Sequence, residues 1–235
     1  MLATTFSLLL RILSNPIGNV FQKKLTEQQN HPLLVNFLTF FILSIFCIVP
    51  ALQQNWEQVS RLSWHYGIIA GIFGAIGNGF LVKALQRGDL SILGPINSYK
   101  SVVGILIGII FLHEIPSVWG IVGIVLIIYG SYFVLDTMKE RFSWNLLRNK
   151  EIQYRIGAMI LTAIEAVFIK KVILYSSTTV SFIFWCWFGA FFSFVLLFFF
   201  KIRFAKEMKQ VKLHHLPAYG CLVLCIGTMQ YTTNY

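Results

Sequence analysis

Long apolar runs limit what this chain can fold into more than any other feature of its sequence. One of them, FIFWCWFGAFFSFVLLFFF at 182–200, contains no charged residue. A helix rises about 1.5 Å per residue, so roughly 20 apolar residues cross the hydrocarbon core of a bilayer. Of the 235 residues, 57% are hydrophobic and only 12% are charged, against about 25% in soluble domains. The sequence therefore predicts an all-α polytopic membrane protein.

The apolar runs are expected to form eight membrane-spanning helices joined mostly by short loops. The longest connection, TMKERFSWNLLRNKEI at 137–152, is polar and charged and divides the chain into regions 1–136 and 153–235. The expected spans are about 3–24, 33–52, 64–85, 90–111, 117–135, 153–174, 179–200 and 214–235.

The formal net charge of +10 does not indicate a nucleic-acid partner, because the basic residues lie in short loops between spans. Loops after the first, third, fifth and seventh spans carry most of the Lys and Arg, which places them in the cytoplasm by the positive-inside rule. Cys47, Cys186, Cys221 and Cys225 all fall in apolar segments and complete no metal-ligand set, so buried packing is expected rather than ligation or a disulfide. We expect neither a metal nor a cofactor.

Two nearly identical pentapeptides reveal an internal repeat. VFQKK at 20–24 and VFIKK at 167–171 each end an apolar run. Aligning them places the sixth span on the first and the seventh on the second. After a three-residue shift, CIGTM at 225–229 falls on AIGNG at 75–79, which pairs the eighth span with the third. Because five spans is an odd number, the second copy enters the membrane from the opposite side, as in the inverted repeats of secondary transporters.

The repeat predicts the domain organisation. Residues 1–136 form a first five-helix unit, 137–152 a charged linker, and 153–235 a second unit that holds three of its five spans. On this interpretation the natural protein has ten spans, and the present chain lacks the last two.

The stretch LGPINSYKSVVGILIGIIFLHEIPSVWGIVGIVLIIYGSYFVL at 93–135 resembles the EamA type of the drug/metabolite transporter superfamily. The family pattern has a Pro early in the fourth span, a Glu after a Phe-Leu pair and a fifth span with spaced glycines. The resemblance implies two inverted five-helix halves around a central cavity, and transport of small organic solutes. We therefore expect a multi-pass protein of the bacterial cytoplasmic membrane. The residues that match the pattern are Pro95, Glu114, Gly120, Gly123 and Gly130.

Small and polar residues form stripes on one face of several spans at helical spacing. Glycines in such stripes are expected to allow close helix packing. Charged and amide side chains there are instead candidates to line a cavity, because they cannot face lipid cheaply. The candidate cavity residues are Arg11, Asn15, Asn78, Asn97, Lys100, Ser101 and Glu165.

Lys100 and Glu165 are the strongest of these candidates. Lys100 lies roughly 15 Å from either end of its expected span, where an unpaired charge costs about 3 kcal/mol or more. It could anchor an anionic group of a solute or form a structural ion pair. Glu165 is the one carboxylate near the middle of an expected span. It could carry a proton or neutralise Lys100 or Arg11.

Other features favour structural roles. Pro16 and Pro95 are expected to kink their helices. Glu114, two residues before Pro116, suits the free N–H groups at the start of the fifth span. The seventh span is apolar on every face, so a peripheral, lipid-facing position is expected.

The sequence thus predicts a solute carrier that works by alternating access around a mid-membrane cavity. The alternative is a non-transporting membrane scaffold whose polar stripes only pack helices. No H-E-x-x-H, G-x-S-x-G or P-loop pattern occurs, so an enzyme is not expected. The expected partners are a small-molecule solute, the lipid bilayer and a second copy of the chain, without nucleic acid.

Overall fold

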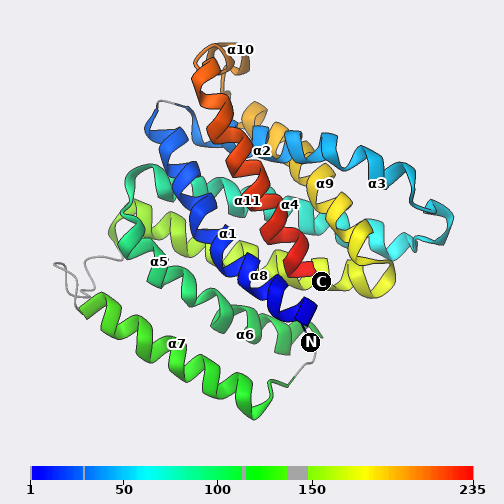
Figure 1. Ribbon diagram of the computed structural model, residues 1–235, viewed down its shortest axis with the longest axis vertical. Helices are drawn as coiled ribbons and strands as arrows, with labels where there is room; N and C mark the ends of the chain where they lie inside the picture. The colour runs from blue at the N-terminus through cyan, green and yellow to red at the C-terminus, as the bar shows by residue number, and fades with distance from the viewer. Residues whose placement is uncertain (1, 29, 113–114, 137–147, 235) are drawn as a thin grey trace.

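The structure, a computed structural model, describes residues 2–28, 30–112, 115–136 and 148–234. Every regular element in that part of the chain is helical, which confirms the all-α fold (Figure 1). Most of the expected linker, residues 137–147, and the family-motif residue Glu114 lie outside the described residues. The α-helices are α1 (Leu2–Glu27), α2 (Pro32–Phe46), α3 (Ile48–Leu52), α4 (Arg61–Arg87), α5 (Leu90–Ser98), α6 (Lys100–Leu112), α7 (Val118–Asp136), α8 (Lys150–Tyr175), α9 (Thr178–Phe199), α10 (Phe204–Met208) and α11 (Leu216–Asn234).

Three helical stretches are long and apolar enough to cross a membrane by length and composition. They are Arg61–Arg87, Leu90–Phe111 and Thr178–Phe199, and two shorter apolar helices cover Pro32–Phe46 and Val118–Phe133. Large apolar side chains are exposed on several helices, as on α7, and suit contact with lipid. The chain is a multi-pass membrane protein, while the number of its spans stays a prediction.

Two of the expected spans are interrupted. The span at 33–52 is divided at Cys47 into α2 and α3, because Pro50 cannot donate a hydrogen bond to the carbonyl of Phe46. The span at 90–111 is divided at Tyr99, whose N–H turns back to Ile96 O at 3.2 Å. Lys100 therefore begins α6 instead of lying inside one continuous helix.

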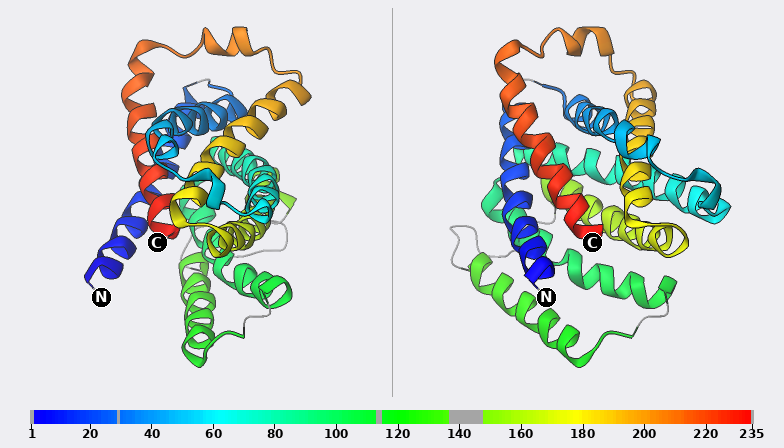
Figure 2. Two further views of the ribbon diagram at one scale, coloured as in Figure 1. Left: turned by 90° about the vertical axis from the view of Figure 1, so that its right-hand side faces the viewer. Right: turned by 45° about the vertical axis from the view of Figure 1, so that its right-hand side comes forward.

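Helix α4 lies at the centre of the bundle and packs against α8, α9, α1 and α2. Helix α1 packs along α11, and α2 packs against α9. Helix α6 lies on α8, and α7 lies at the edge of the molecule against α5 (Figures 1 and 2). The interior is therefore built from segments that are far apart in the sequence.

Two of the packed helix pairs, α4 with α8 and α1 with α11, are antiparallel. Along α4 and α8, Tyr66 stacks on Tyr175 at 5.7 Å between ring centroids, and Phe80 meets Tyr154 at 5.6 Å. Residue numbers rise along one helix as they fall along the other. Helices α1 and α11 also run in opposite directions, so the N- and C-terminal ends of the chain lie at the same end of this pair (Figures 1 and 2).

Glycines let α4 approach its neighbours closely. Gly71 is buried, and a Cβ atom there would overlap Phe188 of α9. One turn further along, a Cβ at Gly74 would overlap Glu165 of α8, and Gly67 lies against Phe184. The expected packing role of these glycines is therefore confirmed.

Helix α9 is exposed near its end, where Phe198 is 82% exposed, but its first half is buried, so the expectation of a peripheral position holds only in part. Its residues Ile183, Phe184, Trp185 and Cys186 are all 3% exposed or less. They pack against α2 and α4. An apolar surface suits protein neighbours as well as lipid, so uniform apolarity does not distinguish the two positions.

A buried polar network joins the end of α1 to the start of α11. The Nδ1 atom of His215, 3% exposed, accepts a hydrogen bond from Lys212 N at 3.3 Å. It also lies 3.3 Å from Asn30 Nδ2, which donates to Leu25 O at 2.8 Å. Burial, with His214 and Lys212 beside it, lowers the pKa of His215 below its usual value. The neutral ring is the form that can accept at Nδ1.

We expect Gly71→Ala to destabilise the fold, because the added methyl group has no space against Phe188. Overpacking of this kind costs about 1–3 kcal/mol. Thermal unfolding of the purified protein in detergent would measure the loss. Gly220→Ala is the matched control, since a Cβ there meets nothing within 4 Å. Equal effects of the two substitutions would contradict the close approach of α4 to α9.

We also expect the stability to fall as the pH drops below about 6.5, where an unfolded histidine takes up a proton. The folded state resists this proton because its pKa is lowered, and protonation at Nδ1 would remove both hydrogen bonds. Thermal unfolding between pH 7.5 and 5.5 should show a smaller loss in His215→Gln than in the wild type. His65→Gln, at an exposed position, is the control and should keep the wild-type slope.

Candidate functional site

The candidate site is centred on Glu165, near the middle of α8. Its side chain is 6% exposed, and Oε1 accepts a hydrogen bond from the indole Nε1 of Trp185 at 2.5 Å. Gly74 of α4 covers the carboxylate from the other side. The site exists because α4 and α8 are antiparallel, which brings a glycine of one helix to the same level as the carboxylate of the other. Three helices therefore enclose this group.

Lys100 lies beside this carboxylate. It is the first residue of α6, half-buried, and directly follows the break at Tyr99. Helix α6 packs on α8, and the charges of Lys100 and Glu165 lie close enough to interact. No ion pair within 4 Å joins these two side chains. They are neighbouring opposite charges without a direct contact.

The structure places the other predicted cavity residues in different surroundings. Asn78 donates to Gly74 O within its own helix at 2.9 Å. Arg11 is exposed on α1, although its charge reaches Lys100. Asn15 and Asn97 are half-buried, and Ser101 is exposed. Lys100 is therefore within electrostatic reach of both Glu165 and Arg11. No hydrogen bond to Glu165 comes from any of the amide and hydroxyl candidates in the described part.

The remaining family-motif residues lie outside this site. Pro95 is inside α5 and half-buried. Gly120 donates its N–H to Ser117 Oγ at 3.2 Å in the first turn of α7, and a Cβ at Gly123 would meet nothing within 4 Å. These residues shape α5 and α7 without contacting Glu165.

Sequence reasoning missed Trp185 at the site and the burial of Arg155 on the same helix as Glu165. Arg155 is 3% exposed on α8 and donates from Nε to Leu93 O at 3.2 Å. Its spacing from Thr162 and Glu165 places it on the same helix face, and that spacing was the available signal. Trp185 lies inside a uniformly apolar run, where only the hydrogen-bonding capacity of an indole could indicate a role.

The site combines a buried carboxylate with one strong donor and nearby cations. A carboxylate can accept further hydrogen bonds from a hydroxyl or amine, or exchange a proton. Lys100 can bind an acceptor or an anionic group. No group of three His, Cys, Asp or Glu residues suited to a metal occurs in the described ranges. The chemistry favoured here is the binding of a polar organic group or a proton.

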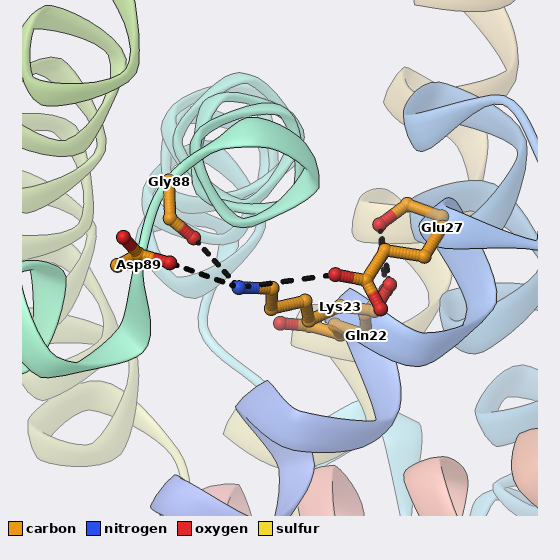
Figure 3. A network of polar contacts seen from close by, with 6 residues as sticks. Gln22, Lys23, Glu27, Gly88 and Asp89 are labelled. Carbon is orange, nitrogen blue, oxygen red and sulfur yellow. Dashed lines mark hydrogen bonds and ion pairs between the residues drawn. The ribbon is translucent and has the colours of Figure 1, made fainter.

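The repeated lysine pairs have different partners in the two copies. Lys23 Nζ donates to Gly88 O at 3.0 Å and lies 3.8 Å from Glu27 and 3.7 Å from Asp89 (Figure 3). These contacts join the end of α1 to the turn between α4 and α5. In the second copy, Lys171 lies over the ring of Tyr66 at 5.3 Å. Lys23 therefore attaches α1 to the turn after α4, and Lys171 attaches α8 to α4.

We expect Trp185→Phe to destabilise the protein by about 1–3 kcal/mol, because Glu165 would lose its buried donor. The same substitution in a Glu165→Met background should cost less, and thermal unfolding of the four proteins would measure this coupling. Trp119→Phe is the control, since Trp119 is 83% exposed. Additive effects of Trp185→Phe and Glu165→Met would contradict the hydrogen bond.

The amino-acid sequence of this chain matches a known protein family and several known proteins. Residues 5–136 match the EamA-like transporter family. Over 115 residues the chain is 30% identical to an uncharacterized protein of Methanocaldococcus jannaschii, covering 48% of this chain and 82% of that protein. Over 94 residues it is 29% identical to a "putative sugar uptake protein" of Streptococcus agalactiae serotype V, covering 38% of this chain and 32% of the relative. A protein of the same printed name from serotype III matches equally. The chain belongs to the EamA-like transporter family.

Proposed function

We propose that this protein is a secondary transporter that moves a small polar organic solute by alternating access. The observation that carries the proposal is the buried carboxylate of Glu165, held between α4, α8 and α9 beside Lys100. A charged group is expensive at this depth and is rarely kept without a function. The membrane concerned is the bacterial cytoplasmic membrane, with the basic loops on its inner side.

The helix contacts support the inverted repeat on which alternating access depends. The first helix of one copy, α1, packs on the third helix of the other, α11. Correspondingly, α4 packs on α8, and α2 packs on α9. In two inverted copies related by a twofold axis in the membrane plane, the first helix of each copy would pack on the third helix of the other, and the two second helices would pack together. The α1–α11 pair and the α4–α8 pair are both antiparallel, as such an axis requires.

The position of Glu165 relates the site to this symmetry. The alignment of VFQKK with VFIKK makes Gly18 of α1 the counterpart of Glu165. Gly18 lies against Ile226 of α11, as Glu165 lies against Gly74 of α4. Glu165 thus occupies one of two equivalent interfaces between the copies. These are the interfaces that rocking of one copy against the other would open and close.

The solute class follows from the groups at the site and is a proposal. A carboxylate and an ammonium group can together bind hydroxyl and other polar groups. The streptococcal relatives carry a name that refers to sugar uptake, which supports testing sugars first. Helix α6 begins at Lys100 after a break, and discontinuous helices provide such groups in many transporters.

We expect a water-filled path to reach Lys100 from one membrane side at a time. With Cys47, Cys186, Cys221 and Cys225 replaced, Lys100→Cys should react with a charged, membrane-impermeant maleimide from one side in oriented vesicles. In this Lys100→Cys protein, Glu165→Gln should change the reaction rate by about tenfold or more or reverse the favoured side, because it removes the carboxylate whose charge acts at position 100.

Two further variants calibrate this experiment. Lys206→Cys, exposed on α10, should react normally, and Leu126→Cys, 64% exposed on apolar α7, should not react. If Lys100→Cys reacts from neither side while Lys206→Cys does, the polar stripes only pack helices and the scaffold alternative holds. Reaction from both sides at equal rates would indicate a channel and would also contradict the proposal.

A further inference from the structure

A second feature lies away from Glu165, where α1, α4 and α9 end. A cavity of about 540 Å³ opens between the start of α2, the last turns of α4 and the segment around α10. All of these segments are at the end of the bundle that carries the Lys23 contacts and the His215 network. The cavity therefore lies at the level of one membrane surface, on the side with the basic loops.

Cationic side chains of α4 form one wall of this cavity. Lys83 and Arg87 lie one turn apart, both are exposed, and neither forms an ion pair with another described residue. His31 lines the opposite side, and its Nδ1 accepts the N–H of Leu33 at 3.2 Å. A neutral His31 then carries its proton on Nε2, which can donate to a ligand. Burial lowers the pKa of His31, so the neutral form dominates near pH 7.

A second, smaller hollow extends this cationic wall. Its volume is about 200 Å³, and it shares Lys83 and Arg87 with the first while adding Lys150 and Tyr154 of α8. The Lys83 ammonium lies 4.6 Å from the centre of the Tyr154 ring. The two hollows thus flank one row of cations that extends from α4 to the start of α8.

The other wall of the larger cavity is apolar. Phe80 of α4 and Phe200 and Ile202 after α9 line it. One carboxylate, Glu207, also lines the cavity, and Glu151 lines the smaller hollow. Lys83, Arg87 and Lys150 outnumber these two carboxylates. The adjoining segment adds Lys201, Arg203, Lys206 and Lys209 and no acid other than Glu207, so the whole face is strongly positive.

We propose that this cavity binds the phosphate headgroup of an anionic phospholipid. Basic pockets between helix ends on the positive side of a membrane protein suit such headgroups. The position at the membrane surface and the apolar wall favour a lipid over a soluble phosphate, because acyl chains can continue from the cavity into the bilayer. Lys83 and Arg87 contact the phosphate, and the His31 imidazole donates a further hydrogen bond. The site is independent of Glu165 and of the transported solute.

The test measures lipid binding to the purified full chain by native mass spectrometry. The probes are dioleoyl phosphatidylglycerol, dioleoyl phosphatidylcholine and sodium phosphate. We expect phosphatidylglycerol to bind roughly tenfold more tightly than phosphatidylcholine. The double variant Lys83→Gln/Arg87→Gln should lose about tenfold in affinity for phosphatidylglycerol and little for phosphatidylcholine, since each such cation contributes severalfold.

Matched controls separate the cavity from the charged face around it. Lys206→Gln/Lys209→Gln removes the same charge from the neighbouring segment and should change the affinity less than about twofold. Equal losses in the two double variants would overturn the site in favour of a diffuse surface effect. Displacement of phosphatidylglycerol by millimolar sodium phosphate would instead assign the cavity to a soluble phosphate. If Lys83→Gln/Arg87→Gln unfolds, the single variant Arg87→Gln takes its place and should lose affinity for phosphatidylglycerol severalfold. An unchanged affinity in a folded Arg87→Gln would also overturn the phosphate contact.

Discussion

The close approach of α4 to α8 and α9 is the contact on which the rest of the structure depends. A membrane bundle gains little from moving apolar surface out of lipid, so its helices are joined by dispersion and by polar contacts. Both require backbones that come near each other. Gly67, Gly71 and Gly74 leave no side chain in the way, and the rings of Phe184 and Phe188 fill the space. Because α4 also contacts α1 and α2, its position determines how helices from both halves of the chain are arranged.

The same closeness explains how a carboxylate is tolerated in the interior. Gly74 admits the Glu165 side chain between α4 and α8, and the indole of Trp185 then reaches it from α9. A hydrogen bond to a charged group offsets part of the desolvation cost, and the nearby charge of Lys100 offsets more. Without the glycine, the carboxylate would have to leave the interface. Packing and the candidate chemistry therefore depend on the same residue.

Much of the fold could be predicted from the sequence because apolar length and helical spacing are local signals. The helices, the glycine packing on α4 and the choice of Glu165 and Lys100 as candidates followed from them. The burial of the first half of α9 could not be predicted, since an apolar helix is compatible with lipid and with protein. The burial of Arg155 and the Trp185 hydrogen bond depend on contacts between distant segments. The break at Tyr99 likewise has no sequence signal as plain as Pro50 at the break after α2.

Under the proposed alternating access, the difference between the α1–α11 and α4–α8 interfaces has a consequence for how the protein moves. At the α1–α11 interface a glycine, Gly18, meets an apolar side chain, Ile226, whereas at the α4–α8 interface Gly74 meets a carboxylate. Separating α1 from α11 exposes mostly apolar groups at this level. Separating α4 from α8 brings the group on Glu165 toward water, which favours its charged form. The free energy of separating α4 from α8 therefore depends on the protonation and ligand contacts of Glu165. The free energy of separating α1 from α11 does not. Such a difference is what allows a bound proton or polar solute to bias an otherwise symmetric exchange between two states.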